Sequence, residues 1–221
     1  MEGRFPMILT VENVSCTVPS RTLFSGLSLS VEGGQSLAVV GPSGSGKSTL
    51  LAAILGMTHP SKGRIEVAGE EISSAKPAQA AQIRREHIGV VFQDGELLPE
   101  LTAAENIAVA LMLNQPGGKE PRIEKARKLL EEVGVPADTR AADLSGGERQ
   151  RTALVRALAT DPELVLADEP TGSLDTITRD AVAEQLFATV RERGAALLVV
   201  THDPTVAARA DATLDLAAYT A

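Results

Sequence analysis

Short apolar runs alternate with longer segments of helical length along most of this chain. Short, continuous apolar runs at residues 36–40, 164–167 and 195–200 are typical of strands buried on both faces. Longer segments at 48–57 and 176–193 have the length and composition of helices. Strands that alternate with helices predict an α/β fold, in which helices cover both faces of a mostly parallel sheet.

The first and middle parts of the chain depart from this alternation. Residues 8–14, followed by the alternating Leu27, Leu29 and Val31, predict strands in an N-terminal β region. In the middle, only helices are predicted, at residues 102–113, 121–133 and 146–159. The other predicted elements are strands at 63–67, 88–92 and 212–216 and helices at 78–86 and 203–208. We therefore expect residues 94–161 to form an inserted helical subdomain.

Composition and charge exclude some functions. The chain of 221 residues contains 2% aromatic residues, so a nucleic-acid platform of stacked rings is not expected. The net charge of −8 also disfavours binding to phosphate backbones, and no nucleic-acid partner is expected. The single cysteine, Cys16, cannot form an intrachain disulfide, which fits a reducing compartment. No apolar run approaches the ~20 residues that span a bilayer, so work at a membrane would require a partner.

The strongest motif lies between the apolar run at 36–40 and the helix at 48–57. It matches G-x-x-x-x-G-K-[ST] at every fixed position and comprises Gly41, Pro42, Ser43, Gly44, Ser45, Gly46, Lys47 and Ser48. Glycines let backbone N–H groups point at one anion, and the following helix adds its positive N-terminal end. We expect Lys47 to reach the β- and γ-phosphates of a nucleotide and Ser48 to supply a hydroxyl to Mg²⁺.

A second motif places two acidic residues at the end of a buried strand. Asp168 and Glu169 directly follow the apolar run at 164–167. Ligands bind at the carboxyl edge of open α/β sheets, so Asp168 suits a role with Mg²⁺ and Glu169 suits the activation of a water molecule. A strand that ends in a charged turn is the plainer interpretation. The acidic pair indicates a nucleotide site only in combination with the phosphate-binding loop.

A third motif, LSGGERQ at residues 144–150, opens the helix predicted at 146–159. Ser145 is a suitable N-cap, and Gly146 and Gly147 leave the first N–H groups of the helix accessible to an anion. An ordinary capped helix is the alternative. Two separate phosphate-binding surfaces in one chain suggest that two chains share one nucleotide.

In this order, the three motifs resemble those of the ATP-binding cassette (ABC) ATPases, and the resemblance covers essentially the whole chain. It implies one nucleotide-binding domain over residues 1–221. A P-loop NTPase core at 1–93 and 162–221 would contain an antiparallel β subdomain, and the helical subdomain would occupy 94–161. The resemblance also implies ATP and Mg²⁺ as cofactors, hydrolysis of ATP, and a homodimer that forms on ATP binding.

The resemblance assigns roles to further residues. Gln93 matches the glutamine of the Q-loop, His202 matches the switch histidine, and Ser173, Leu174 and Asp175 match the D-loop, whose aspartate links two copies. The implied catalytic residues are Lys47, Gln93, Glu169 and His202, and the implied metal ligands are Ser48, Gln93 and Asp168. The implied nucleotide contacts are residues 41–48, Thr49, Asp175 and, from a second copy, Ser145, Gly146 and Gly147.

Residues 97–106 and 168–175 are similar to the macrolide-export, lipoprotein-release and cell-division ATPases of this family. The similarity implies a separate integral membrane permease and a peripheral position on the cytoplasmic face of the inner membrane. It leaves open an export ATPase and a signalling ATPase that transmits force to a cell-wall enzyme without transport. A soluble ABC ATPase that acts on nucleic acid or ribosomes is disfavoured by the acidic charge and the single cassette.

The expected docking surface for the permease runs from Asp94 to Leu101 and contains Leu97 and Leu98. Core packing at the subdomain boundary is an equally good account of these two leucines.

One position departs from the family pattern. Val18 stands where the family usually has an aromatic residue that stacks on adenine. Because valine cannot stack, we expect shape and apolar contact to hold the base and the triphosphate to supply most of the affinity.

Overall fold

The computed structural model describes residues 6–19, 21–114, 121–172 and 174–220. The strands are β1 (Met7–Val18), β2 (Arg21–Glu32), β3 (Ser36–Val40), β4 (Lys62–Val67), β5 (Glu70–Glu71), β6 (Ile88–Val91), β7 (Leu164–Asp168), β8 (Ala196–Val200) and β9 (Ala212–Asp215). The helices are α1 (Lys47–Ile54), α2 (Pro77–His87), α3 (Ala103–Asn114), α4 (Arg122–Glu132), α5 (Gly146–Leu158), α6 (Thr176–Glu192) and α7 (Pro204–Ala207). Two 3₁₀ turns, η1 (Ala141–Asp143) and η2 (Leu216–Tyr219), complete the description.

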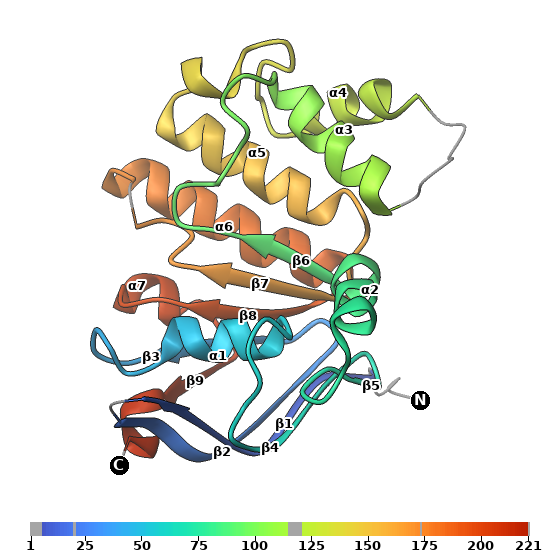
Figure 1. Ribbon diagram of the computed structural model, residues 1–221. Coiled ribbons are helices and arrows are strands. Elements are labelled where there is room, and N and C mark those ends of the chain that lie inside the picture. The colour runs from blue at the N-terminus through green and yellow to red at the C-terminus, as the bar shows by residue number, and fades with distance from the viewer. Residues whose placement is uncertain (1–5, 20, 115–120, 173, 221) are drawn as a thin grey trace, which may run out of the picture.

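A parallel sheet in the order β6-β7-β8-β3-β9 crosses the centre of the molecule (Figure 1). Leu164 of β7 lies opposite Ala196 of β8, and Ser36 of β3 lies opposite Leu197 of β8. Because these strands run in one direction, the loops that follow β3, β6, β7 and β8 emerge at the same edge. The predicted α/β fold with a P-loop NTPase core is confirmed.

Both faces of this sheet are buried. Leu166 of β7 belongs to one hydrophobic cluster with Leu50 of α1, and the next-door Val165 belongs to another with Leu154 of α5 and Leu186 of α6. Successive side chains of a strand point to opposite faces, so a strand covered on both sides must be apolar at every position. This is why the continuous apolar runs identified the strands correctly.

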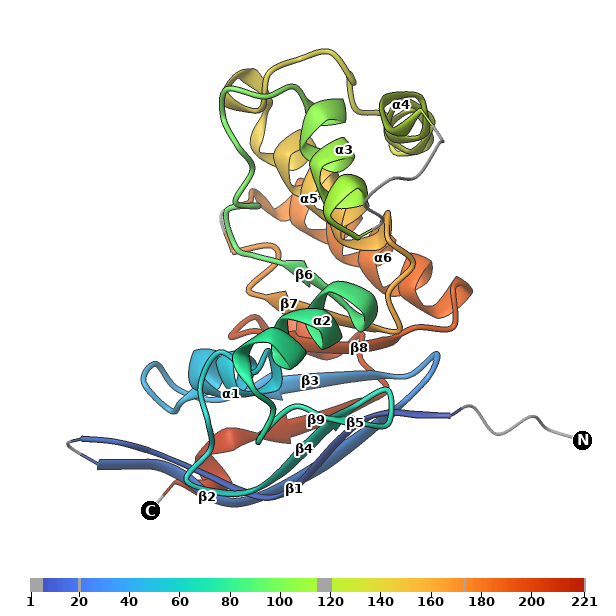
Figure 2. The same cartoon turned by 45° about the vertical axis from the view of Figure 1, so that its right-hand side comes forward.

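The N-terminal β region forms a second, antiparallel sheet in the order β2-β1-β4-β5, which lies below β9 in Figure 2. The hairpin of β1 and β2 is longer than predicted, since β1 covers Met7–Val18 rather than 8–14. Register shifts, such as the one between Val11 and Val14, interrupt the apolar alternation from which strands are predicted. Strand β5, Glu70–Glu71, was not predicted because two charged residues carry no apolar pattern.

The inserted helices lie at the end of the molecule away from the second sheet (Figure 1). Ile107 of α3 and Leu130 of α4 share a hydrophobic cluster with Val155 of α5. Since α5 also packs on the central sheet, it joins the helical part to the core. The bounds of the helical subdomain at residues 94 and 161 stay a prediction. None of the described helices combines the length and the hydropathy needed to cross a membrane.

Candidate functional site

A cavity of about 370 Å³ lies at the edge of the parallel sheet where β3, β6 and β7 end. The phosphate-binding loop follows β3, Gln93 comes shortly after β6, and Asp168 ends β7. The residues that line the cavity are Arg21, Leu23, Ser43, Gly44, Gly46, Lys47, Ser48, Thr49, Gln93, Asp168 and Glu169. Two motifs that lie far apart in the sequence therefore meet at one site.

The loop requires glycine at Gly41 and Gly46, where φ is +149° and +100°. A Cβ on Gly46 would lie 2.9 Å from Cδ1 of Phe24, and a Cβ on Gly41 would lie 2.9 Å from Oγ of Ser45. Neither the space nor the backbone conformation suits a larger residue. The loop is therefore packed tightly, against the core at Gly46 and against its own Ser45 at Gly41.

The loop and the first turn of α1 fit a phosphate group. The N-cap, Gly46, has no side chain to occupy the first N–H groups of the helix, and the first turn contains no acidic residue. The ammonium of Lys47 donates hydrogen bonds to the carbonyl oxygens of Gly41 (2.8 Å) and Pro42 (3.1 Å), which holds its charge beside the loop. Within the described residues, the buried Oγ of Ser45 has no hydrogen-bond partner. A helix N-terminus with an adjacent cation is a ready anion site.

Oxygen donors line the same cavity. Burial raises the pKa of Asp168, and the carboxylate of Glu169 raises it further, whereas Lys47 acts in the opposite direction. A poorly solvated carboxylate gains from a nearby cation. The hydroxyl of Ser48, the amide oxygen of Gln93 and the carboxylate of Asp168 are ligand types that Mg²⁺ prefers. These residues therefore fit the predicted metal, and their role as ligands stays a prediction.

Glu169 and His202 are in direct contact. Oε1 of Glu169 lies 2.8 Å from Nδ1 of His202, and the backbone N–H of His202 donates to Oε2 at 3.2 Å. Glu169 has φ +44°, an uncommon value for a residue other than glycine, and its backbone N–H donates to the carbonyl of Val200 at 2.9 Å. Such conformations cluster at functional sites. In this conformation, Glu169 both lines the cavity and contacts His202.

The LSGGE motif lies apart from the cavity of its own chain. Oγ of Ser145 accepts from the backbone N–H of Glu148 at 3.3 Å, and Oε2 of Glu148 accepts from the N–H of Ser145 at 2.8 Å. The contacts with Ser145 lower the pKa of Glu148. This capping box begins α5, with Ser145 as the predicted N-cap. Ser145, Gly146 and Gly147 are not among the residues that line the cavity.

The D-loop lies beside the LSGGE motif. A Cβ on Gly146 would come within 3.3 Å of Cδ2 of Leu174. Asp175 caps α6, because its Oδ1 accepts from the N–H groups of Ile177 (3.1 Å) and Thr178 (3.2 Å). The hydrogen bonds from Thr178 are the main reason that the pKa of Asp175 is lowered. Its link to a second copy stays a prediction, and Ser173 lies outside the described residues.

Two cavity residues carry no motif in the sequence. Arg21 begins β2 and donates from Nη2 to the carbonyl of Gly44 at 2.7 Å, and Leu23 lies on the same strand. Only the packing of the β1–β2 hairpin brings them there. Val18 is partly buried against the core of the β region and is not a lining residue, so its contact with the base stays a prediction.

The sequence model of the ABC transporter family matches residues 24–172, which contain the phosphate-binding loop, Gln93, LSGGERQ, Asp168 and Glu169. This chain belongs to the ABC transporter family. It is the nucleotide-binding ATPase part of such a system, as the motifs predicted.

Curated relatives come from the predicted group. The chain is 42% identical over 197 residues to the uncharacterized ABC transporter ATP-binding protein YbbA of Escherichia coli K12, covering 88% of this chain and 86% of YbbA. It is 41% identical over 197 residues to the lipoprotein-releasing system ATP-binding protein LolD of Chromohalobacter salexigens, covering 88% and 83%. The macrolide export ATP-binding/permease protein MacB of Rhodopirellula baltica is 43% identical over 192 residues, which are 86% of this chain but only 28% of MacB.

Solved structures of an ABC cassette are similar over nearly the whole chain. A dimeric structure of the ATP-binding cassette MJ0796 in a post-hydrolysis state, bound to ADP and Pi, has a TM-score of 0.85 and 32% identity and covers 94% of both chains. A second dimeric structure of MJ0796 has a TM-score of 0.84. The family's cassettes thus include dimers that bind nucleotide with this fold.

Replacing Gly46 with Ala should weaken ATP binding by tenfold or more. The new Cβ would press on Phe24 at the N-terminus of α1, and strain of ~1–3 kcal/mol at such a position would displace the loop. Binding of a fluorescent ATP analogue measures the effect. Gly69→Ala is the matched control, because Gly69 also has positive φ (+81°) but a Cβ there meets nothing within 4 Å. Equal affinity in the two variants would contradict the role of the loop.

Proposed function

We propose that this protein is the nucleotide-binding subunit of an ABC exporter: two copies close on ATP, and hydrolysis drives a separate integral membrane permease. The observation that carries the proposal is the separation of the LSGGE motif from the phosphate-binding cavity within one chain. Both are helix N-termini that suit an anion. Two copies that face each other would surround each γ-phosphate from both sides.

Each copy supplies the phosphate-binding loop and the metal ligands of one nucleotide site, and the second copy completes it. Residues 41–49 bind the phosphates through backbone N–H groups, and Lys47 lies against the β- and γ-phosphates. Ser48, Gln93 and Asp168 would hold Mg²⁺, which neutralises charge on the phosphate oxygens when bound. Arg21 steadies the loop through its hydrogen bond to Gly44.

Hydrolysis requires a proton acceptor beside the attacking water. Glu169 is a carboxylate that lines the cavity, and it accepts the proton as the water attacks the γ-phosphorus. The bond from the γ-phosphorus to the bridging oxygen breaks, and ADP leaves with that oxygen. The hydrogen bond of 2.8 Å to His202 holds this carboxylate in place and keeps the imidazole near the γ-phosphate. Gln93 links this chemistry to the segment that follows it, from Asp94 to Leu101.

The nucleotide biases an equilibrium between open and closed pairs of subunits. Ser145 and Gly147 of the second copy contact the γ-phosphate only in the closed pair, and Asp175 lies at the contact between copies. ATP therefore favours closure, whereas ADP lacks the group on which closure depends. Opening after hydrolysis would return the permease to its starting state.

The direction of transport is inferred from relatives. MacB is named for macrolide export and LolD for lipoprotein release, and both are at least 41% identical to this chain. Both names describe movement out of or away from the membrane, which favours export over uptake. The subunit would then work at the cytoplasmic face of the membrane, held there by its permease.

The permease is proposed to dock beside the stretch from Asp94 to Leu101. A groove of about 450 Å³ lies next to it, with residues of α2, β6, α3 and α5 in its walls. Apolar and basic side chains are mixed there: Phe92, Ala110, Leu113, Arg84, Arg85 and Arg156. This combination suits an amphipathic helix that carries acidic side chains.

The docking stretch is tied to this groove. Arg156 donates hydrogen bonds to the carbonyls of Gly95 (2.7 Å) and Glu96 (2.6 Å). Leu98 is 49% exposed, whereas Leu97 packs against the helical cluster. Core packing therefore accounts for Leu97, whereas Leu98 is accessible to a partner.

Replacing Glu169 with Gln should lower ATP turnover by ~10²–10⁴, because an amide cannot accept the proton of the water. Binding of ATP should be retained. Phosphate release and a fluorescent ATP analogue measure the two quantities. Glu192→Gln, at an exposed position at the end of α6, should hydrolyse ATP at the parent rate. A parent-like rate in Glu169→Gln would show that another group is the base.

Replacing Ser145 with Asp should abolish the ATP-dependent dimer of a Glu169→Gln background. Asp is as good an N-cap as Ser, and its charge would face the γ-phosphate. It would also lie beside the carboxylate of Glu148, which accepts from Oγ of Ser145 at 2.6 Å, so circular dichroism must show that the variant is folded. Ser145→Asn is the matched control, since Asn also caps the helix and is neutral. Sedimentation analysis with ATP measures the dimer. A dimer that survives in Ser145→Asp, or is lost equally in Ser145→Asn, contradicts a γ-phosphate contact.

Replacing Leu113 with Glu should reduce association with the proposed permease. Leu113 is 61% exposed and lines the groove, where a new carboxylate would repel acidic side chains. Met57→Glu changes an equally exposed residue (63%) that does not line it. Co-purification after co-expression measures the complex. If both variants bind the permease equally well, the groove is not the docking site of the permease.

A further inference from the structure

Four titratable side chains meet at the edge of the sheet opposite the nucleotide cavity. His87 ends α2 directly before β6, and Glu163 directly precedes β7. Glu86 neighbours His87 on α2, and Glu70 comes from β5 of the antiparallel sheet. Three segments that are distant in the sequence are therefore joined at this point, and neither the nucleotide motifs nor the permease groove uses it.

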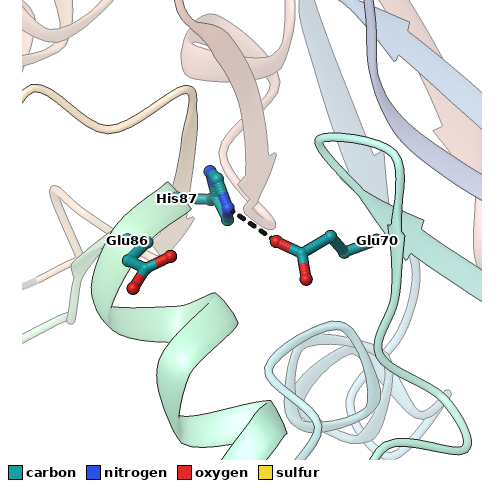
Figure 3. A group of neighbouring side chains, drawn as sticks. All are labelled: Glu70, Glu86 and His87. Atoms are coloured by element: carbon teal, nitrogen blue, oxygen red, sulfur yellow. Dashed lines mark hydrogen bonds and ion pairs between the residues drawn. The ribbon is translucent and has the colours of Figure 1, made fainter.

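The imidazole of His87 lies between carboxylates. Its Nε2 is 3.0 Å from Oε1 of Glu70, and its Nδ1 is 2.8 Å from Oε1 of Glu163. Figure 3 shows the carboxylates of Glu70 and Glu86 on either side of the ring. One ligand atom from each of Glu70, Glu86 and His87 lies within 4.8 Å of the other two.

Few positive charges balance these carboxylates. Within the described residues, Glu70 and Glu163 have no ion pair with Arg or Lys, and Glu86 has only a contact of 3.5 Å with Arg85. The neighbouring Glu71, by contrast, pairs with Arg64. Three carboxylates thus face a single imidazole, whose side chain is only 19% exposed.

We propose that Glu70, Glu86 and His87 form a binding site for a divalent transition-metal ion, with Zn²⁺ as the preferred occupant. An imidazole nitrogen and two carboxylate oxygens are common Zn²⁺ ligands, and water would complete the tetrahedron. Tetrahedral ligands about 2.0–2.1 Å from Zn²⁺ lie about 3.3 Å apart. Glu70 would therefore move off the direct line to Nε2, and the exposed Glu86 would swing inward.

Glu163 has a different part in this site. Metal-bound histidines usually donate their other ring N–H to a carboxylate, which fixes the orientation of the ring. The contact between Nδ1 of His87 and Glu163 supplies this arrangement. Nε2, on the side of Glu70, is then the nitrogen that would bind the metal. The ion would replace the present contact between Nε2 and Glu70, and it would fasten β5 to the start of β6.

The test is titration of the nucleotide-free, chelator-treated protein with Zn²⁺ by calorimetry, and with Co²⁺ by visible absorption. The parent should bind one ion with the spectrum of a four-coordinate site. His87→Ala and Glu86→Gln should each weaken this binding by tenfold or more. Glu86→Gln is decisive, because Glu86 has no hydrogen bond to His87 and the protein should stay folded by circular dichroism.

Matched controls separate this site from others. His59→Ala removes a histidine whose Nδ1 lies 2.9 Å from the carbonyl of Ser73, and Glu132→Gln removes an exposed carboxylate elsewhere, so both should bind Zn²⁺ as the parent does. His202→Ala tests binding in the nucleotide cavity. The proposal is overturned if the parent binds no Zn²⁺ at 100 μM free ion. It is also overturned if Glu86→Gln binds as tightly as the parent, or if His202→Ala alone removes the ion.

Discussion

Parallel hydrogen bonding between β6, β7, β8 and β3 is the constraint on which the rest of the structure depends. Neighbouring strands that run in one direction end at the same edge, so the loops after them must meet there. The phosphate-binding loop, Gln93, the pair Asp168 and Glu169, and His202 all lie at or beside that edge. The chemistry of the site is thus a consequence of burying apolar strands between layers of helices.

The same architecture supports our proposal that two copies share each nucleotide. The phosphate-binding loop leads into α1 on one part of the sheet, whereas Ser145 opens α5, whose other end is committed to the helical cluster. Both helices present N-termini, but packing keeps them at separate places in one chain. The solved MJ0796 cassettes, which have this fold, are dimeric, as pairing of two copies would require.

The two ends of the central strands have different chemistry. β6 and β7 begin next to His87 and Glu163 and end next to Gln93 and Asp168. A short, buried strand is a stiff connection, because its hydrogen bonds on both sides and its packing on both faces leave few other conformations open to it. An ion that fastens the first end would therefore stabilise the frame that positions the second.

Local physics is what could be predicted from the sequence. The glycines of residues 41–46, the cap at Ser145 and the runs buried on both faces each depend on neighbours within a few positions, so the fold class and the phosphate-binding loop followed from pattern. The roles of Gln93, Asp175 and His202 were assigned only by resemblance to the family. Register shifts defeated the pattern in β1. The contact of Glu169 with His202 and the approach of Arg21 to the loop were decided only by tertiary structure. They join residues whose distance along the chain carries no information on which strands lie side by side.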